Sequence, residues 1–379
     1  MMDPQHRPRD APGEQGATRA HGSVADHTLA VTPPDAVPVP RIPGYEIECE
    51  LGRGGMGVVY LARDIKLHRQ VAIKTVSVAG RAPPKILERF RTESQAVAGL
   101  QHPNIGQVFV ADEYDGQPYF VMEFIAGPNL GDQTRNRPQE AKSAAELVAI
   151  LADAIQYCHE RHILHRDLKP NNVLMVDSRT PKIVDFGLAK SLTSDSSATR
   201  TGEILGTPGY MAPEQASGVV KTLGPECDVY GLGAILYRLL TGRPPFDAPE
   251  PLQTVIMVLT DDAIPPRQLQ RQIPRDLETI CLKCLAKSPA RRYRSAAELA
   301  SDLRRFVAGK PIVARPVGFL ERVMKFARRR PSLAALGASL LLMITASVLG
   351  LTWHNRKLGA SLARSQRLVD HGSELSMWV

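Results

Sequence analysis

The chain has 379 residues, of which 43% are hydrophobic and 23% are charged. This composition is that of a globular protein, and it excludes a collagen-like or a wholly disordered chain. Five cysteines are too few for a disulfide framework in a chain of this length, so a reducing compartment is expected. The formal net charge is +8, and the excess is local, because residues 315–330 carry six Lys and Arg residues against one acidic residue.

The first 43 residues are polar, charged and rich in proline, and they show no apolar periodicity. A segment of this composition buries too little apolar surface to fold, so residues 1–43 are predicted to be a disordered leader. The same residues lack the apolar stretch that defines a secretory signal peptide.

Ordered patterning begins at Tyr45. Three successive runs alternate between apolar and polar residues, as half-buried strands do, and a helical run and two further strand-like runs follow. The predicted strands are 45–51, 58–62, 71–76, 107–111 and 118–124, and the predicted helix is 84–100. This part of the chain is therefore expected to form a small lobe built on a β-sheet.

Beyond residue 127 the pattern changes to helical, and several helix ends can be predicted. Ser143 and Glu146 form the S-x-x-E pattern of a capping box ahead of apolar residues at helical spacing. Gly242 is expected to end a second apolar helix, and Ser295 to begin a last one that runs to about residue 307. The predicted fold class is α+β, with a small strand-rich lobe followed by a larger helical lobe.

A glycine-rich run, Gly52-Arg53-Gly54-Gly55-Met56-Gly57, lies between the first two predicted strands. A similar pattern occurs in dinucleotide-binding folds, but there the glycines open a helix. Here a second strand follows, so that interpretation fails. A glycine-rich hairpin can instead fold over a triphosphate, because its backbone N–H groups approach the oxygens without a Cβ in the way.

Lys74 ends the third predicted strand, in the run Val71-Ala72-Ile73-Lys74. A lysine at such a position is more often a solvated edge residue. Its spacing from the glycine run would also let it reach phosphates beneath that run, provided that a carboxylate holds it there. Glu93, on the following predicted helix, is the candidate for this carboxylate.

Three further motifs follow in order: His165-Arg166-Asp167-Leu168-Lys169-Pro170-Asn171-Asn172, Asp185-Phe186-Gly187 and Ala212-Pro213-Glu214. With these motifs, the glycine run and Lys74, the chain resembles the eukaryotic-type (Hanks-type) serine/threonine protein kinases. The resemblance covers roughly residues 45–307, and it is strongest to the bacterial membrane-anchored group. It implies a bilobal protein-kinase fold over 44–307, with an N-lobe at 44–125 and a C-lobe at 126–307.

The resemblance also implies a role for each motif residue in phosphoryl transfer from ATP. Asp167 would accept or orient the proton of the substrate hydroxyl, and Lys169 would neutralise charge on the migrating phosphoryl group. Lys74, braced by Glu93, would bind the α- and β-phosphates. These four residues are the predicted catalytic set.

A metal and an adenine site follow from the same resemblance. Asn172 and Asp185 would hold Mg²⁺, or Mn²⁺ in its place, because these cations prefer oxygen ligands. Met122 is similar to the gatekeeper residue, and residues 123–125 to the hinge whose backbone binds adenine. The implied ATP-binding residues are Leu51, Gly52, Arg53, Gly54, Gly55, Met56, Gly57, Val59, Ala72, Lys74, Met122, Glu123, Ile125 and Leu174.

Other motif positions are implied to be structural. Glu214 would form an ion pair with Arg292 in the larger lobe, and Asp228 would brace the backbone of the catalytic loop. Thr207 would contact the same loop. None of these residues would take part in the chemistry directly.

A stretch rich in serine and threonine lies between Gly187 and Ala212. The resemblance implies that Arg166, directly before the predicted catalytic aspartate, pairs with a phosphate on this stretch. Thr199 and Thr201 match the paired threonines of the bacterial family, and we predict that the protein phosphorylates them itself. The alternative is that the hydroxyl groups only reflect a solvated loop.

Residues 331–353 form a run of 23 uncharged residues behind the basic segment 308–330. A helix of this length spans roughly 35 Å, enough for a hydrocarbon core of about 30 Å, so one transmembrane helix is predicted, with a buried core helix as the alternative. Lys and Arg are denser before the run than after it, which predicts a single-pass protein of the cell (inner) membrane with a cytoplasmic kinase domain. Residues 354–379 would be a short extracytoplasmic tail, whose length is also compatible with truncation of a longer chain.

The sequence as a whole predicts a serine/threonine protein kinase that uses ATP and protein substrates and contacts membrane lipid. Nucleic acid is not an expected partner, because the membrane-flanking position explains the arginines, and a homodimer is one possible assembly. The alternative function is a catalytically weak scaffold or receptor with a kinase fold. That alternative predicts the loss of at least one of Lys74, Asp167, Asn172 and Asp185, and all of them are present.

Two positions depart from the family pattern in ways that concern the fold. Gly106 stands where a branched apolar residue is usual, which predicts a slightly weaker strand. His162 replaces a glycine just after the helix that precedes the catalytic loop. Histidine is among the residues that tolerate left-handed geometry, so a small cost is expected.

Overall fold

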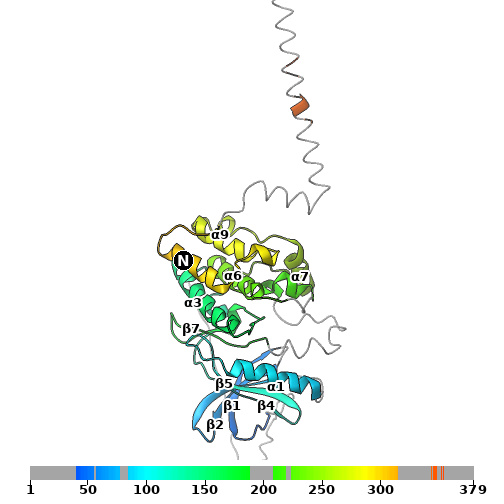
Figure 1. Cartoon of the computed structure of the whole chain (residues 1–379), viewed down its shortest axis with the longest axis vertical. Helices are drawn as coiled ribbons and strands as arrows, with labels where there is room; N and C mark the ends of the chain where they lie inside the picture. The colour runs from blue at the N-terminus through cyan, green and yellow to red at the C-terminus, as the bar shows by residue number, and fades with distance from the viewer. Residues whose placement is uncertain are drawn as a thin grey trace, which may run out of the picture. The chain divides into compact units, whose positions relative to one another are not determined.

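The computed structural model describes residues 40–54, 57–76, 84–187, 208–218 and 223–314, together with the positions 343, 345–347, 351 and 353. The chain divides into two units, Met1–Arg41 and Ile42–Val379, and every described helix and strand lies in the second. Figure 1 shows a strand-rich lobe and a helical lobe in this unit. The predicted α+β class and the predicted division into two lobes are confirmed.

The strand-rich lobe is an antiparallel sheet with the strand order β1-β2-β3-β5-β4. All five strands predicted from alternation are present, with their ends shifted, and the predicted helix is α1. The elements are β1 (Tyr45–Gly54), β2 (Gly57–Asp64), β3 (Arg69–Val76), α1 (Pro84–Ala98), β4 (Val108–Tyr114) and β5 (Gln117–Glu123).

The register of the strands separates the two faces of the sheet. Val59, Lys74 and Phe120 lie opposite one another on β2, β3 and β5, so their side chains share one face. Ile73 and Val121, one residue along, point to the other face, where both are buried. The apolar cluster on that other face contains Ile42, Ala62, Val71, Ile73, Tyr119 and Val121.

The face that carries Lys74 is partly covered by α1. Phe90 of α1 contacts Phe120 with a distance of 4.8 Å between ring centroids, and both side chains are buried with Val76. The remainder of this face is directed at the helical lobe, so the sheet leaves a space between the lobes beside Lys74.

Gly106 lies in the connection between α1 and β4, outside any strand. The predicted strand began at residue 107, whereas β4 begins at Val108. The N–H of Gly106 donates to the carbonyl of Ile183 at 2.8 Å, so this connection is bonded to the helical lobe. The expectation that Gly106 weakens a strand is therefore wrong, because the residue is not part of one.

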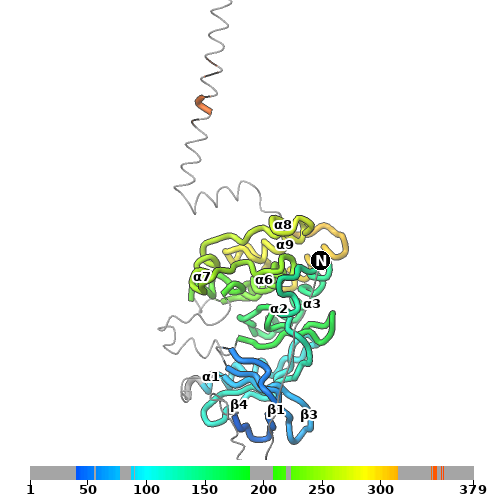
Figure 2. Tube along the Cα trace, turned by 180° about the vertical axis from the view of Figure 1, so that it is seen from behind, coloured from blue at the N-terminus to red at the C-terminus, as the bar shows by residue number. Residues whose placement is uncertain are grey.

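The helical lobe begins after the hinge that follows β5. Its two short strands form a hairpin. Both views show α9 at the end of the lobe farthest from the sheet, and Figure 2 shows α8 at the same end (Figures 1 and 2). Its elements are α2 (Leu130–Gln133), α3 (Ala141–His159), β6 (Val173–Met175), β7 (Pro181–Ile183), α5 (Pro213–Ala216), α6 (Glu226–Thr241), α7 (Pro251–Thr260), α8 (Pro266–Leu269), α9 (Arg275–Cys284) and α10 (Ala296–Val307), with single 3₁₀ turns at Pro170–Asn172, Pro208–Tyr210 and Pro289–Arg291.

The centre of this lobe is α6, which is apolar on all sides. Every residue from Cys227 to Leu240 except Arg238 is buried, as expected for a helix surrounded by other helices. It contacts α3, α9 and α10 and carries Asp228 in its first turn. The helix that holds the core together thus also presents a carboxylate toward the catalytic loop.

The ends of the helices follow the predicted chemistry in two cases and depart from it in one. Gly242 has the left-handed φ of 77° that ends α6, and the Ser295 hydroxyl accepts a bond from the Glu298 N–H at the start of α10. The predicted capping box at Ser143 is wrong. The carboxylate of Glu140 instead accepts bonds from the backbone N–H groups of Lys142 and Ser143, so α3 begins earlier.

The helical lobe continues past its predicted end at residue 307. The carboxylate of Asp302 in α10 accepts bonds from the backbone N–H groups of Val313 (2.6 Å) and Ala314 (2.8 Å) and from the Tyr293 hydroxyl (2.8 Å). Ala314 is buried in the main core. The compact domain therefore extends to Ala314, because a buried carboxylate needs these donors.

Several predictions concern residues outside the described part of the chain. They include the leader 1–39, Gly55, Met56, Thr199, Thr201, Thr207, the basic segment from 315 onward and the tail after 353. Of the predicted membrane segment 331–353, only positions 343, 345–347, 351 and 353 are described, and they are helical and exposed. Within the described residues, none of the helices has the length and apolar character needed to span a bilayer.

Candidate active site

The glycine-rich run joins β1 to β2, and glycine is needed at its described positions for different structural reasons. Gly57 has φ 143°, and a Cβ there would overlap the carbonyl oxygen of Thr75 on β3, so close strand packing requires glycine. Gly52 and Gly54 are different, because a Cβ on either would have no described atom within 4 Å. These two glycines leave open space beside the sheet, as a bound phosphate chain requires.

The side chains of the same run are largely at the surface. Leu51 is 46% exposed, and the guanidinium of Arg53 forms an ion pair with Glu50 at 2.6 Å. Both residues were predicted to contact ATP. The contact of Leu51 with ATP stays a prediction, and the charge of Arg53 is already paired along its own strand.

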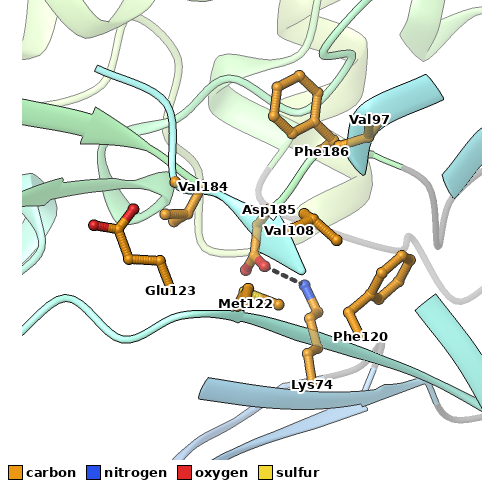
Figure 3. Close-up of a pocket in the computed structure, with 10 residues that line it drawn as sticks. Lys74, Val97, Val108, Phe120, Met122, Glu123, Val184, Asp185 and Phe186 are labelled. Carbon is orange, nitrogen blue, oxygen red and sulfur yellow. Dashed lines mark ion pairs between the residues drawn. The ribbon is translucent and has the colours of Figure 1, made fainter. Parts of the chain in front are cut away.

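Lys74 is half-buried, and its Nζ lies 2.8 Å from Oδ1 of Asp185. Figure 3 shows the two side chains pointing toward each other from β3 and from the segment after β7. Asp185 has a left-handed backbone, with φ 60°, which turns its carboxylate out of the strand direction. Glu93 is half-buried on α1, and its pairing with Lys74 stays a prediction.

A mostly apolar cavity lies between the lobes beside this ion pair (Figure 3). Met122 is opposite Ala72 in the register of β5 and β3, so both lie on the face of the sheet that carries Lys74 and Val59. The cavity is lined by Lys74, Val97, Gly106, Val108, Phe120, Met122, Glu123, Val184, Asp185 and Phe186.

The hinge connects this cavity to the helical lobe. The Ile125 side chain is buried, and its carbonyl accepts a bond from the Gly127 N–H at 2.9 Å. Leu174 of β6 is bridged to Asn129, which follows the hinge. The predicted adenine residues thus come from both lobes and meet where the chain crosses between them.

The predicted catalytic residues of the helical lobe form one bonded group. Lys169 Nζ lies 2.9 Å from Oδ2 of Asp167, and Asn172 Nδ2 donates to the same oxygen at 3.0 Å and to the Asp167 carbonyl at 2.9 Å. Because the amide nitrogen of Asn172 is used in this way, its amide oxygen is the atom with the chemistry of a metal ligand.

Asp228 lies beneath this loop and is almost completely buried. Its carboxylate accepts bonds from the His165 N–H (2.9 Å), the Arg166 N–H (2.8 Å) and His159 Nε2 (2.8 Å). Burial alone would raise the pKa of Asp228, but the hydrogen bonds from the His159 side chain and from the His165 backbone N–H help to outweigh it, and this pKa lies below its usual range. The expected bracing of the catalytic loop is therefore visible as two backbone bonds, and a third bond ties the carboxylate to His159 of α3.

His165 connects the catalytic loop with the segment that carries Asp185. Its Nδ1 accepts the Asp167 N–H at 3.2 Å, its Nε2 donates to the Val184 carbonyl at 3.1 Å, and its ring lies 4.7 Å from that of Phe186. Complete burial lowers the pKa of His165, so the imidazole is neutral, in agreement with one accepting and one donating nitrogen.

The ion pair between Glu214 and Arg292 is present. Both guanidinium NH groups meet the carboxylate, at 2.6 and 2.8 Å, and the Arg292 side chain is fully buried. The guanidinium also donates to the backbone carbonyls of Glu226, Ala286 and Lys287. A buried arginine with this many partners fixes the segment at 213–216 to the core of the lobe.

Three contacts near the site were missed at the level of sequence. Lys182 of β7 pairs with both carboxylate oxygens of Glu123 at 2.7 Å, Gln215 donates to the Arg166 carbonyl at 2.8 Å, and His159 supports Asp228. Each pair is distant in sequence. A lysine in the middle of a short strand or a glutamine after a motif gives no signal of its own.

The residues present fit the group that the family resemblance implies. Mg²⁺ is usually bound by one or two carboxylates together with substrate phosphates, and Asp185 and the amide oxygen of Asn172 supply such oxygen donors next to Lys74 and Lys169. The described residues hold no cluster of three or more His, Cys, Asp or Glu that would form an all-protein metal site.

Comparison with known proteins agrees with this geometry. The protein kinase domain family matches residues 45–302, more than half of the chain. The chain belongs to the protein kinase family. The matched region covers both lobes, from β1 to α10, and includes every bonded group of the site.

Two relatives with similar sequences are also protein kinases. The chain is 40% identical over 272 residues to the serine/threonine-protein kinase PknB of Mycobacterium leprae, covering 70% of this chain and 43% of the relative. It is 37% identical over 266 residues to the serine/threonine-protein kinase PrkC of Bacillus subtilis, covering 70% and 41%. The chain thus spans less than half the length of these curated relatives. The crystal structure of the Mycobacterium tuberculosis PknI kinase domain matches with a TM-score of 0.57 and 27% identity, covering 70% of this chain and 96% of that one.

The burial of neutral His165 predicts a pH dependence of stability. The pKa of His165 is lower in the folded than in the unfolded state, so below about pH 6.5 the unfolded chain takes up a proton that the folded chain does not. The contribution of His165 to the free energy of unfolding is therefore complete above about pH 6.5. It falls as the pH falls, by at most about 1.4 kcal/mol per pH unit. Urea unfolding of the chain ending at Ala314 should therefore show a smaller loss of unfolding free energy between pH 7.5 and 5.5 for His165→Phe than for the wild type. His162→Asn is the matched control, because His162 is exposed and asparagine tolerates its φ of 60°. Equal slopes for wild type and His165→Phe would contradict the prediction.

Proposed function

We propose that the protein is a serine/threonine protein kinase that transfers the γ-phosphate of ATP to hydroxyl groups of protein substrates. One observation supports this most directly: Lys74 of the strand-rich lobe pairs with Asp185 of the helical lobe at the cavity between the lobes, and the residue before Asp185 is bonded through Asn172 and His165 to the Asp167–Lys169–Asn172 group. Positioning and charge stabilisation supply nearly all of the catalysis of phosphoryl transfer, and this arrangement provides both.

Each side chain has a task that its contacts support. Lys74 on the sheet offers a cation to phosphate oxygens beneath the open glycines of the β1–β2 hairpin. Asp167 accepts or orients the hydroxyl proton of the substrate, and Lys169, 2.9 Å away, supplies positive charge to the transferred group. Mg²⁺ bound by Asn172 and Asp185 would neutralise charge on the phosphates. The serine/threonine specificity follows from Lys169, which stands two residues after Asp167 as in that class.

The test of catalysis is transfer of label from γ-labelled ATP to a generic protein substrate. Lys74→Met and Asp167→Asn should each lower the rate by about 100-fold or more, because the first removes a charge that positions the phosphates and the second removes the carboxylate that accepts or orients the hydroxyl proton. Both variants should keep the melting temperature of the wild type within a few degrees. Retention of more than about a tenth of the activity by Lys74→Met would assign the phosphate contact to another lysine.

The scaffold alternative gives a different result in the same assay. A scaffold would label no better than its Asp167→Asn variant, although it could still bind nucleotide. Equal and negligible transfer by the two proteins, with intact folding, would replace the proposed activity by this alternative.

We further propose that Thr199 and Thr201 are phosphorylated by the protein itself. Nε of Arg166 is buried, and in the described part of the chain it has no hydrogen-bond partner. The backbone of Arg166 is fixed by Asp228 and Gln215, so the guanidinium is carried on a rigid support. A phosphate brings about −2 charge and three acceptor oxygens, which a guanidinium can bind in a bidentate manner.

Mass spectrometry of the purified protein after incubation with ATP tests this activation. Phosphate is expected on Thr199 and Thr201, and the Thr199→Ala/Thr201→Ala variant should lose activity by about tenfold or more, the scale of one strong charge-assisted contact. Thr180→Ala is a control, because Thr180 lies on the β6–β7 turn and bonds only locally, to Asp177. Full activity of the double variant, with phosphate confined to residues 1–43, would contradict the proposal.

We also propose that residues 331–353 cross the cell membrane once, with the kinase domain in the cytoplasm. The proposal rests on the uncharged run of 23 residues and on the basic residues that precede it. The basic segment 308–330 was predicted to link the domain to the membrane. Because Val313 and Ala314 are bonded to Asp302 of the domain, the linker in this proposal begins after residue 314.

Fractionation of cells that express two lengths of the chain tests the anchor and the domain boundary together. The full chain should sediment with membranes, and a chain ending at Ala314 should remain soluble and folded. A chain ending at Val307 should be less stable by about 2 kcal/mol or more, because Asp302 loses two of its donors. A full chain that stays in the soluble fraction would contradict the membrane proposal.

A further inference from the structure

Gly106 has no side chain, and the space where one would stand is occupied by another residue. A Cβ on Gly106 would lie 2.8 Å from Cγ1 of Val184, a separation that real Cβ atoms do not show. Its next neighbours would be Cδ1 of Ile125 and the carbonyl of Ile183, both at an ordinary 3.6 Å. The conflict therefore concerns Val184 alone, the residue directly before Asp185.

Val184 has little freedom to move away, because its backbone is bonded on both sides. Its N–H donates to the Asn172 carbonyl at 2.9 Å, and its carbonyl accepts from His165 Nε2 at 3.1 Å. One residue earlier, the carbonyl of Ile183 accepts from Gly106 itself at 2.8 Å. The branched side chain of valine is also restricted at χ1, so rotation of the Val184 side chain away from a Cβ on residue 106 would be energetically unfavourable.

We propose that Gly106 is a positioning residue: its missing side chain makes the room that Val184 needs, and Val184 in turn sets the places of Asp185 and Asn172. This inference rests on the proposed roles of Asn172 and Asp185 in holding Mg²⁺. Gly106 supplies no ligand to the metal, although its backbone lines the cavity between the lobes. It acts from the α1–β4 connection, through the Val184 side chain.

A side chain at residue 106 would act on the metal ligands in a definite way. Displacement of Val184 lengthens its bond to the Asn172 carbonyl and shifts the neighbouring Asp185, whose carboxylate is bonded to Lys74. Small displacements of this kind are costly in active sites, where a shift of about 1 Å can lower the rate by ~100-fold. Binding of nucleotide without metal depends on the sheet, the hinge and the cavity that Gly106 also lines, and a methyl group there would meet Ile125 of the hinge only at an ordinary 3.6 Å.

The test is a double-mutant cycle on the full chain with Gly106→Ala, Val184→Ala and the combination. Gly99→Ala is the matched control, because Gly99 lies in the same connection and a Cβ there would meet only backbone carbonyls at 3.5 and 3.8 Å. Calorimetry measures the Kd of a non-hydrolysable ATP analogue in excess Mg²⁺ and in EDTA for each protein. The ratio of the two Kd values reports the metal site without any turnover.

In Gly106→Ala the tightening of nucleotide binding by Mg²⁺ should fall by about tenfold, while the Kd in EDTA stays within about twofold of the wild type. Val184→Ala, which removes the opposing methyl groups, should restore the Mg²⁺ effect in the double variant to within about threefold of the wild type. The kcat should follow the same order. A role in stability alone would lower the melting temperature without changing the Kd ratio of the folded protein.

Several results would overturn the proposal. If the Gly106→Ala variant behaves as the Gly99→Ala variant does, Val184 can move aside without disturbing Asp185 and Asn172. A Gly106→Ala variant that is unfolded or impaired, and that Val184→Ala does not recover, would show that the conflict is not with Val184. Loss of the Mg²⁺ effect in Val184→Ala alone would separate Val184 from Gly106. A wild type without any Mg²⁺ effect would instead refute the metal roles of Asn172 and Asp185, which is a failure of the proposed function.

Discussion

The carboxylate of Asp228 is almost completely withdrawn from water, yet it carries the backbone of the catalytic loop. A buried charge costs several kcal/mol unless hydrogen bonds compensate it, and here the donors are His159 and the N–H groups of His165 and Arg166. Arg166 has a left-handed φ of 62°, which costs about 1–2 kcal/mol and persists only where its surroundings enforce it. Asp167 comes next, so the central helix of the lobe determines where the carboxylate of this proposed catalytic residue stands.

The second carboxylate of the site, Asp185, is supported from the opposite direction. The strand before it is bonded to Asn104 and Gly106 in the α1–β4 connection, and the Val184 backbone is bonded to Asn172 and His165. The two supports meet at His165, which contacts Asp228, Asp167 and Val184 at once. A displacement on either side is therefore transmitted to the other, and the geometry of the site is a property of both lobes together.

Features that depend on local spacing could be predicted from the sequence. Alternation in 71–76 predicted β3, and Gly242 and Ser295 predicted helix ends, because each of these signals lies within one element. Ser143 was misleading, because the carboxylate of Glu140, a residue outside the usual set of helix-capping residues, accepts the same backbone N–H groups one turn earlier. The contacts of Asp302 could not be predicted because its partners lie outside its own helix, and those of Lys182 and Val184 could not because their partners lie in the other lobe. The ordered motifs identified the family, but not the contacts that hold its residues in place.

The position of β1 at the edge of the sheet has a consequence for the exchange of nucleotides. Separation of the two lobes as rigid bodies would break the Glu123–Lys182 pair and the bonds between Ile183 and the α1–β4 connection. Lifting β1 breaks its ladder with β2 on one side, the hydrogen bond from Gln70 to Glu48, and the packing of Tyr45 and Ile47, whereas the glycines at its end have open space around them. Under the proposed activity, the end of β1 that carries these glycines is therefore the part of the edge strand expected to fray when ADP leaves.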